Sequence, residues 1–219
     1  MIRTFHVCKS YGARTALSNV TLHIEKGEFV FINGPSGAGK TTLLKLLYLG
    51  ERVTKGQILI DGVNLQRINS KRLPFLRRKI GVVFQDFKLI DTLTVFQNIA
   101  LPLEVVGRDK QYIRKKVSHV LRMVGLENRI NAFPPHLSGG EQQRIAIARA
   151  VVNDPLILLA DEPTGNLDAN ASRIVLNLLR QLHIRGTTVL IATHDRQSLS
   201  QSNDRAIALN KGQVMNIDD

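Results

Sequence analysis

Short apolar runs alternate along the chain with longer stretches whose apolar positions recur at helical spacing. We expect β-strands over 29–33, 57–60, 81–84, 156–160 and 187–192, because these runs are short and are bounded by polar or turn-forming residues. The run 156–160 is continuously apolar, which is typical of a central parallel strand covered on both faces.

Three further stretches predict helices. Five leucines between positions 43 and 49 are dense enough for a buried helix over 41–49. A second helix is expected over 110–124, and a third helix around 174–182. The apolar faces of these two helices would be formed by Ile113, Val117, Val120, Leu121 and Val124, and by Ile174, Leu178, Leu179 and Leu182.

Alternating strands and helices indicate an α/β fold with a mostly parallel sheet. The stretch 87–150 shows no convincing strand pattern, so we interpret it as a helical insert. We therefore expect a single domain over residues 1–219, in which 1–86 and 151–219 form the core and 87–150 a helical subdomain.

Composition narrows the class of protein. The chain has 219 residues, of which 43 % are apolar, and this is enough to build a substantial core. A single cysteine, Cys8, excludes an internal disulfide framework and fits a reducing compartment. No signal peptide is expected, and every apolar run is far shorter than the roughly 18 residues of a membrane-spanning helix.

The charge balance favours anionic partners. Thirty Lys and Arg residues against 18 Asp and Glu residues give a formal net charge of +12. Nucleotide, nucleic acid and an acidic membrane surface are all compatible with this excess. Many of the cations lie in 67–79 and 108–122, where a solvated helical face is the alternative interpretation.

One loop carries a specific chemical signal. Residues 34–41 read Gly-Pro-Ser-Gly-Ala-Gly-Lys-Thr and match the phosphate-loop pattern G-x-x-x-x-G-K-[ST] between an expected strand and an expected helix. Glycines let successive N–H groups point at an anion, the lysine adds a positive charge, and the threonine hydroxyl is placed for Mg²⁺. The expected nucleotide-binding residues are Gly34, Pro35, Ser36, Gly37, Ala38, Gly39, Lys40, Thr41 and Thr42.

Two carboxylates follow the apolar run 156–160. Asp161, at the end of a strand beside a phosphate loop, is the second expected metal-holding residue, acting through water. Glu162 could polarise an attacking water, which makes it the candidate general base. A salt-bridged structural role for Glu162 is the alternative.

Residues 137–144, Leu-Ser-Gly-Gly-Glu-Gln-Gln-Arg, resemble the signature sequence of the ATP-binding-cassette (ABC) ATPases. Further motifs of this family are present in the family's order. Gln85 matches the Q-loop, 161–162 closes the Walker B strand, 165–168 matches the D-loop and His194 the switch histidine. Tyr11 stands where the family has its adenine-stacking residue.

This resemblance implies a P-loop NTPase core, an N-terminal antiparallel β subdomain and a helical signature-motif subdomain. It implies a head-to-tail homodimer in which the signature of one chain closes over the ATP bound by the other, with Mg²⁺ as cofactor. The residues expected to act across the dimer interface are Ser138, Gly139, Gly140, Glu141 and Asp168. A helix N-cap is an alternative role for Asp168.

The resemblance also assigns roles within one chain. Tyr11 would stack on adenine with Ala16 along the same edge, although a half-buried core tyrosine is the alternative for Tyr11. Gln85 would touch Mg²⁺ and the attacking water. His194 would contact the γ-phosphate. The expected catalytic residues are Glu162, His194, Gln85 and Lys40, and the expected metal-holding residues are Thr41, Gln85 and Asp161.

Finer resemblance favours the cell-division members of the family. Residues 74–81, Pro-Phe-Leu-Arg-Arg-Lys-Ile-Gly, running into 84–86 resemble the Q-loop approach of those proteins. Lipoprotein-release and macrolide-export ATPases share Asp-Glu-Pro-Thr-Gly-Asn-Leu-Asp at 161–168 and stay open as alternatives. A nucleic-acid-associated ABC ATPase is the alternative from a different class, although no long coiled coil separates the phosphate loop from the signature.

A cell-division member would work at the cytoplasmic face of the inner membrane, at the division septum, through an integral membrane partner. It would act with the division machinery and bind no nucleic acid directly. The partner would insert a short helix into a groove after Gln85. Apolar candidates for that contact are Phe87, Leu89, Val95 and Phe96, for which a place in the core of the insert is the alternative. The basic stretches would face the anionic leaflet.

Overall fold

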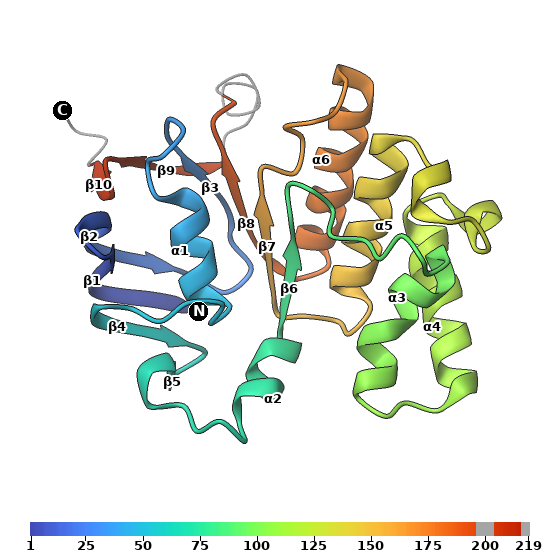
Figure 1. Ribbon diagram of the computed structural model, residues 1–219, viewed down its shortest axis with the longest axis horizontal. Helices are drawn as coiled ribbons and strands as arrows, with labels where there is room; N and C mark the ends of the chain where they lie inside the picture. The colour runs from blue at the N-terminus through green and yellow to red at the C-terminus, as the bar shows by residue number, and fades with distance from the viewer. Residues whose placement is uncertain (196–203, 216–219) are drawn as a thin grey trace.

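The computed structural model describes residues 1–195 and 204–215. Figure 1 shows two sheets side by side, with a group of helices beyond the second. The antiparallel sheet has the order β2-β1-β4-β5 and contains β1 (Ile2–Tyr11), β2 (Arg14–Ile24), β4 (Lys55–Ile60) and β5 (Val63–Asn64). The second sheet has the order β10-β9-β3-β8-β7-β6. Its strands are β3 (Phe29–Asn33), β6 (Ile80–Val83), β7 (Ile157–Asp161), β8 (Thr188–Thr193), β9 (Arg205–Asn210) and β10 (Gln213–Met215).

The second sheet is parallel except at β10, which pairs antiparallel with β9. Its register aligns the carboxyl ends of the central strands. Asn33 of β3 pairs with Thr193 of β8, and Asp161 of β7 pairs with Ala192. The loops that follow β3, β7 and β8 therefore start at the same edge, where open α/β sheets bind ligands.

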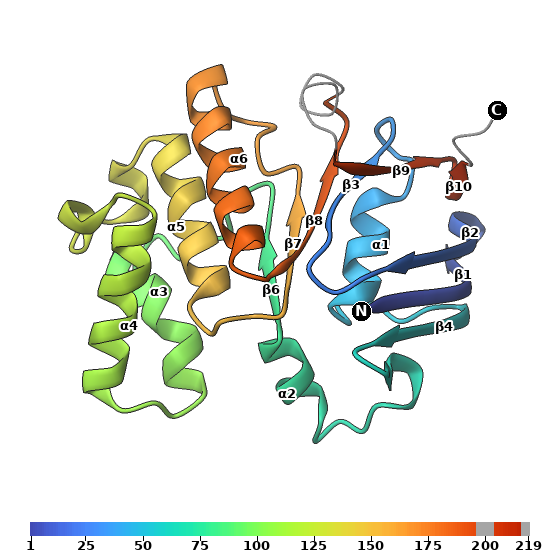
Figure 2. The same cartoon turned by 180° about the vertical axis from the view of Figure 1, so that it is seen from behind.

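Both faces of the parallel sheet are covered. Alternate residues of its strands point to opposite faces, and each face packs against a different layer. Val30 and Ile32 pack with α1 (Lys40–Leu47) on the face toward the antiparallel sheet. Phe29 and Phe31 pack on the other face with α6 (Ala169–Ile184) and the helices beyond it. Seen from behind, α6 stands between α5 and the strands β7 and β8 (Figure 2).

The helical part consists of α3 (Val95–Val105), α4 (Lys110–Met123) and α5 (Gly139–Val151), which pack on one another. Each begins at a residue whose side chain accepts a hydrogen bond from the first turn: Thr94, Asp109 and Ser138. The shorter helices are α2 (Leu73–Arg78), η1 (Leu65–Arg67), η2 (Glu127–Arg129) and η3 (Pro134–His136). No described helix is both long and apolar enough to cross a membrane.

The fold class expected from the sequence is confirmed, including the N-terminal antiparallel sheet and the strand-free helical insert. Three details differ. β7 lies one strand from the edge, because only β6 is beyond it in the described part of the sheet. Ile174 is exposed and Val175 takes its place on the buried face of α6. β9 and β10 were not expected. The proposed boundaries at 86 and 150 stay predictions; α5 continues to Val151.

Candidate nucleotide-binding site

The phosphate loop bridges the end of β3 and the start of α1. Gly37 and Gly39 adopt left-handed φ values of 79° and 106°, which glycine reaches without steric penalty. A Cβ at Gly39 would also lie 2.7 Å from the Ala16 carbonyl oxygen. Gly39 is the N-cap of α1 and supplies no side-chain cap. The first amides of α1 are thus available to an anion.

Lys40 is buried beneath this loop. Its Nζ donates to the carbonyl oxygens of Gly34 at 2.7 Å and Pro35 at 3.2 Å, and lies 3.3 Å from Glu162 Oε1. These contacts hold the ammonium group at the floor of the loop, where a point charge stabilises phosphate oxygens.

Thr41 and Asp161 lie together although 120 positions separate them in sequence. Thr41 Oγ1 donates to Asp161 Oδ1 at 3.0 Å. Burial raises the pKa of the Asp161 carboxyl, and the neighbouring Glu162 charge raises it further, against the hydrogen bond from Thr41. The Thr41 hydroxyl and the Asp161 carboxylate together form an oxygen ligand set that suits Mg²⁺. Burial disfavours an uncompensated negative charge on Asp161, and a bound cation would compensate it.

Replacing Asp161 by Asn is expected to raise the unfolding midpoint of the nucleotide-free protein, by roughly 2–4 °C, and to reduce Mg²⁺-dependent hydrolysis. Because the pKa of Asp161 is higher in the folded protein than in the unfolded chain, stability associated with this group is present at acid pH and lost as pH rises through the folded pKa. The gain should therefore be present near about pH 8 and shrink toward about pH 4, as the carboxyl takes up a proton.

Thermal scans at both pH values test this expectation. Asp154→Asn is the control, because Asp154 is an exposed carboxylate that pairs with Lys116 away from the site. Equal unfolding midpoints for Asp161→Asn and the parent at neutral pH would contradict the inference that burial of the charged Asp161 carboxylate destabilises the fold.

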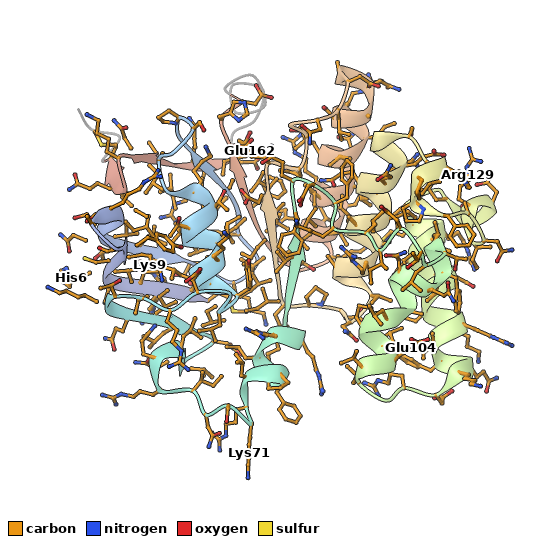
Figure 3. The ribbon with its side chains drawn as sticks, in the orientation of Figure 1. His6, Lys9, Lys71, Glu104, Arg129 and Glu162 are labelled. Atoms are coloured by element: carbon orange, nitrogen blue, oxygen red, sulfur yellow. The ribbon has the colours of Figure 1, made fainter. Side chains whose placement is uncertain are left out.

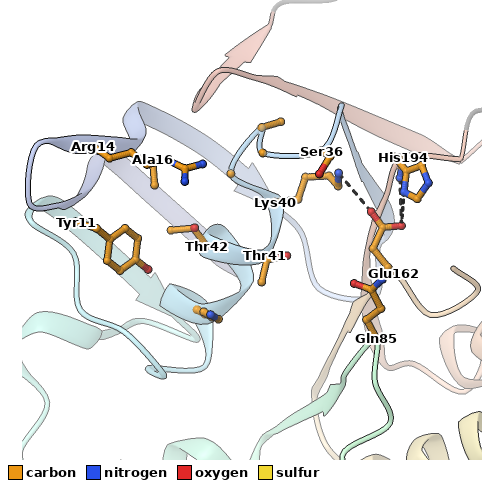
Figure 4. Close-up of a pocket in the computed structure, with 14 residues that line it drawn as sticks. Tyr11, Arg14, Ala16, Ser36, Lys40, Thr41, Thr42, Gln85, Glu162 and His194 are labelled. Carbon is orange, nitrogen blue, oxygen red and sulfur yellow. Dashed lines mark hydrogen bonds and ion pairs between the residues drawn. The ribbon is translucent and has the colours of Figure 1, made fainter. Parts of the chain in front are cut away.

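Glu162 connects three elements. Its backbone is left-handed, with φ 46°, immediately after β7, a conformation that non-glycine residues hold only under local constraint. Glu162 Oε2 accepts from the His194 backbone N–H at 3.3 Å and lies 2.9 Å from His194 Nδ1, while Oε1 faces Lys40 (Figure 4). The carboxylate is thus oriented between the phosphate loop and the loop after β8.

A cavity of about 470 Å³ opens over the phosphate loop. Figure 4 shows Tyr11 and Glu162 at opposite sides of it, with Thr41 between them and Gln85 beneath Glu162. The predicted site residues that line this cavity are Tyr11, Ala16, Ser36, Gly37, Ala38, Gly39, Lys40, Thr41, Thr42, Gln85, Glu162 and His194. Gly34 and Pro35 do not line the cavity; they act through the carbonyls that hold Lys40. Asp161 lines an adjoining cavity with Thr41 and Gln85.

Tyr11 ends β1 and its side chain is 42 % exposed, so it does not belong to the core. The Lys9 ammonium lies 4.6 Å from the centre of its ring. A cation over one face of the ring contributes a modest attraction that favours this orientation of the ring.

Two lining residues, Arg14 and Lys45, were not anticipated from the sequence. Arg14 begins β2, three residues after Tyr11, and Lys45 lies one turn beyond Thr41 on α1. The spacing of Lys45 from the phosphate loop could have identified it. No local signal marks Arg14, because the hairpin between β1 and β2 places it there.

The signature residues lie elsewhere. Ser138, Gly139, Gly140, Glu141 and Asp168 line a separate cavity of about 290 Å³, and none of them lines the phosphate cavity. Ser138 and Glu141 form a capping box: Ser138 N–H donates to Glu141 Oε2 at 2.9 Å, and Glu141 N–H donates to Ser138 Oγ at 3.3 Å. The Ser138 backbone hydrogen bond lowers the pKa of Glu141, as does Arg129.

Asp168 is the N-cap of α6, where its carboxylate accepts from Ala171 N–H at 2.8 Å. The helix-cap alternative for Asp168 therefore holds. A role for Asp168 across an interface stays a prediction, because capping leaves its remaining lone pairs available.

Comparison with known proteins agrees with this geometry. The sequence profile of the ABC transporter family matches residues 17–165. The FtsE cell division ATP-binding protein of Bacillus subtilis is 49 % identical over 98 % of this chain and 95 % of its own length. The FtsE protein of Escherichia coli K12 is 48 % identical over 98 % of this chain and 97 % of its own.

Solved structures give the same result. The dimeric structure of MJ0796, described as a bacterial ABC transporter cassette, is 41 % identical, with a TM-score of 0.90 over 99 % of this chain and 97 % of its own. A second MJ0796 dimer, in a post-hydrolysis state with ADP and Pi, is 39 % identical, with a TM-score of 0.90 over the same shares of both chains. The chain therefore belongs to the family of ABC transporter ATPases and, within it, groups with the FtsE cell-division ATP-binding proteins.

Proposed function

We propose that this ATPase is the motor subunit of a cell-division complex, in which it binds an integral membrane protein resembling FtsX. Its ATP cycle would be transmitted through that partner to cell-wall hydrolases outside the membrane. The observation that carries this proposal is the identity of about 48 % to FtsE proteins over nearly the full chain.

We infer that the active species is a head-to-tail homodimer. In one chain the phosphate loop and the signature residues line two different cavities, which supports a site that is shared between two copies. Both MJ0796 structures are described as dimeric. A second copy would bring its Ser138, Gly139 and Gly140 amides to the open side of the phosphate cavity.

The chemistry within each half-site follows from the contacts of Glu162. Its carboxylate would accept the proton of the attacking water, and His194 would hold that carboxylate through Oε2. Lys40 would stabilise the phosphate oxygens from beneath. Thr41, Asp161 through water, and Gln85 would hold Mg²⁺, which would neutralise the charge of the transferring phosphate. Tyr11 would stack on the adenine.

A groove beside Gln85 fits the partner contact. It is the adjoining cavity of about 380 Å³ that Thr41 and Asp161 also line, and its wall further includes the apolar Leu44, Tyr48, Val82 and Phe84 and the charged Lys45, Asp86 and Lys88. Of the apolar residues expected here, Val95 is fully buried, so it belongs to the core. Leu89 and Phe96 are half-buried against the same core. None of the expected residues Phe87, Leu89, Val95 and Phe96 lines this cavity. Ile90, in the segment that follows Gln85, is 39 % exposed.

Replacing Ile90 by Glu is expected to weaken retention of an FtsX-type membrane protein at least about tenfold, because a charge would enter an apolar contact. Co-expression with that protein, followed by affinity capture in detergent, measures the retention. ATP binding by the isolated chain should not change.

Ile184→Glu is the matched control, since Ile184 is 80 % exposed at the end of α6. Equal retention of both variants would place the contact elsewhere. Capture of a lipoprotein-releasing permease pair in place of the FtsX-type protein would contradict the cell-division assignment.

We also propose that the segment around α2 faces the anionic inner leaflet. No acidic residue occurs between Asp61 and Asp86. Phe75 is 63 % exposed and Arg78 stacks on its ring at 4.9 Å. Figure 3 shows Lys71 projecting from the lower edge of the molecule, far from Glu162. An exposed aromatic ring in a segment that carries cations and no acidic residue suits an anionic lipid surface. Binding to anionic but not to zwitterionic vesicles would be the measurement.

A further inference from the structure

The segment around Gln85 is a tight turn with an uncommon backbone. Phe87 N–H donates to Phe84 O at 3.2 Å, which closes a turn with Gln85 at its second position. Phe87 and Lys88 then follow with φ values of 56° and 51°. Two consecutive non-glycine residues in the left-handed region are rarely stable alone, so neighbouring groups must hold them.

Arg149 of α5 supplies that support. Its guanidinium donates to Phe87 O at 2.8 Å and to Lys88 O at 2.6 Å. The planar guanidinium presents its two N–H groups to the adjacent carbonyls in a fixed fork, whereas a lysine ammonium is a compact charge on a flexible stem and would not hold them in the same geometry. Burial lowers the pKa of Arg149, because the guanidinium has lost part of its hydration. Among the described residues, the carbonyl oxygens of Phe87 and Lys88 accept hydrogen bonds from it and so replace part of that hydration.

The same turn also reaches the beginning of α5. A Cβ at Gly139 would lie 4.0 Å from Phe87 Cζ and 3.6 Å from Leu167 Cδ2. Gly139 and Arg149 are ten residues apart, about 15 Å along the helix. The turn that carries Gln85 therefore lies beside the start of α5, and Arg149 hydrogen-bonds it to the same helix two to three turns later.

We propose that Arg149 is the positioning residue that couples the signature helix to Gln85. When α5 moves, its guanidinium moves the carbonyls of Phe87 and Lys88, and through them the turn that places Gln85 over the ATP cavity. Arg149 lines none of the described cavities around the phosphate loop or the signature, so it acts through the turn and not on ATP. This inference rests on the proposed role of Gln85 in hydrolysis.

A double-mutant cycle between Arg149→Lys and Gln85→Ala tests the inference in the full chain with Mg²⁺ and ATP. We expect Arg149→Lys alone to lower kcat about tenfold while the Kd for ATP changes less than about twofold, because Lys40 and the phosphate loop are untouched. In the Gln85→Ala background, Arg149→Lys should lower kcat no further, since residues that act through one another are not additive.

Asn153→Ala is the control for a general loss of stability, because Asn153 Nδ2 donates to Pro102 O at 3.4 Å in the same helical part and does not touch the turn. Its kcat should equal that of the parent. Additive effects of Arg149→Lys and Gln85→Ala, or an unchanged kcat in Arg149→Lys, would overturn the inference. An unchanged kcat in Gln85→Ala would instead overturn the role of Gln85 itself, and with it the inference.

Discussion

Replacing Glu162 by Gln should lower steady-state ATP hydrolysis by about 10²–10⁴-fold, the range that a positioned general base contributes. The amide is nearly the same size as the carboxylate and can still meet His194, but it cannot take a proton from water. ATP affinity should be retained or increased, because one negative charge near the phosphates is removed. Because hydrolysis would no longer release the two copies, gel filtration with ATP should show a dimer.

Glu28→Gln is the matched control. Glu28 pairs with Arg205 at 2.9 Å, in the described part of the chain away from the phosphate cavity. Its phosphate release should match that of the parent. If Glu162→Gln kept most of its hydrolysis in a well-folded protein, the base would have to be another group.

Replacing Lys40 by Ala should abolish ATP binding at working concentrations, raising the Kd at least about 100-fold. Charged hydrogen bonds contribute roughly 1.5–3 kcal/mol each, and every 1.4 kcal/mol corresponds to about tenfold in Kd. The change also leaves the Gly34 and Pro35 carbonyls without their donor. Equilibrium binding of a fluorescent ATP analogue measures the loss, with Lys71→Ala as the exposed-lysine control.

Mixing two inactive variants distinguishes an active site that is shared between two chains from one that lies within a single chain. A Lys40→Ala chain has no working phosphate loop, and a Ser138→Arg chain has no working signature. In a head-to-tail dimer of the two, one site has both intact parts, so hydrolysis should return on mixing. No recovery despite dimer formation would contradict a site built from two copies.

The parts of the site that are built from residues close together in the sequence could be predicted from the sequence. The anion site of the phosphate loop is formed by consecutive residues, namely the glycines at 37 and 39 and the helix that follows them. The apolar composition of the run before Asp161 likewise predicts a buried strand. The capping box at Ser138 is likewise visible as serine followed three residues later by glutamate. The strand before Asp161 and the helix after Gly39 appear where the sequence predicts them.

Long-range contacts could not be predicted in the same way. Arg14 reaches the cavity because β1 and β2 form a hairpin with several register shifts, which no single segment encodes. The attachment of Arg149 to the turn after Gln85 joins residues 61 and 62 positions apart. β9 is held in the sheet by β3, which lies far earlier in the chain, and β10 pairs antiparallel with β9. Such contacts depend on tertiary packing.

The capping box has a consequence for selectivity among anions. In a single chain, the start of α5 is already neutralised by a carboxylate that belongs to the same turn. A dissolved phosphate or sulfate ion must compete with this tethered group, whose effective concentration is far above that of a free solute. An anion held on the docked surface of a second copy would have a comparable advantage. We therefore expect the start of α5 to bind such an anion in preference to free inorganic anions.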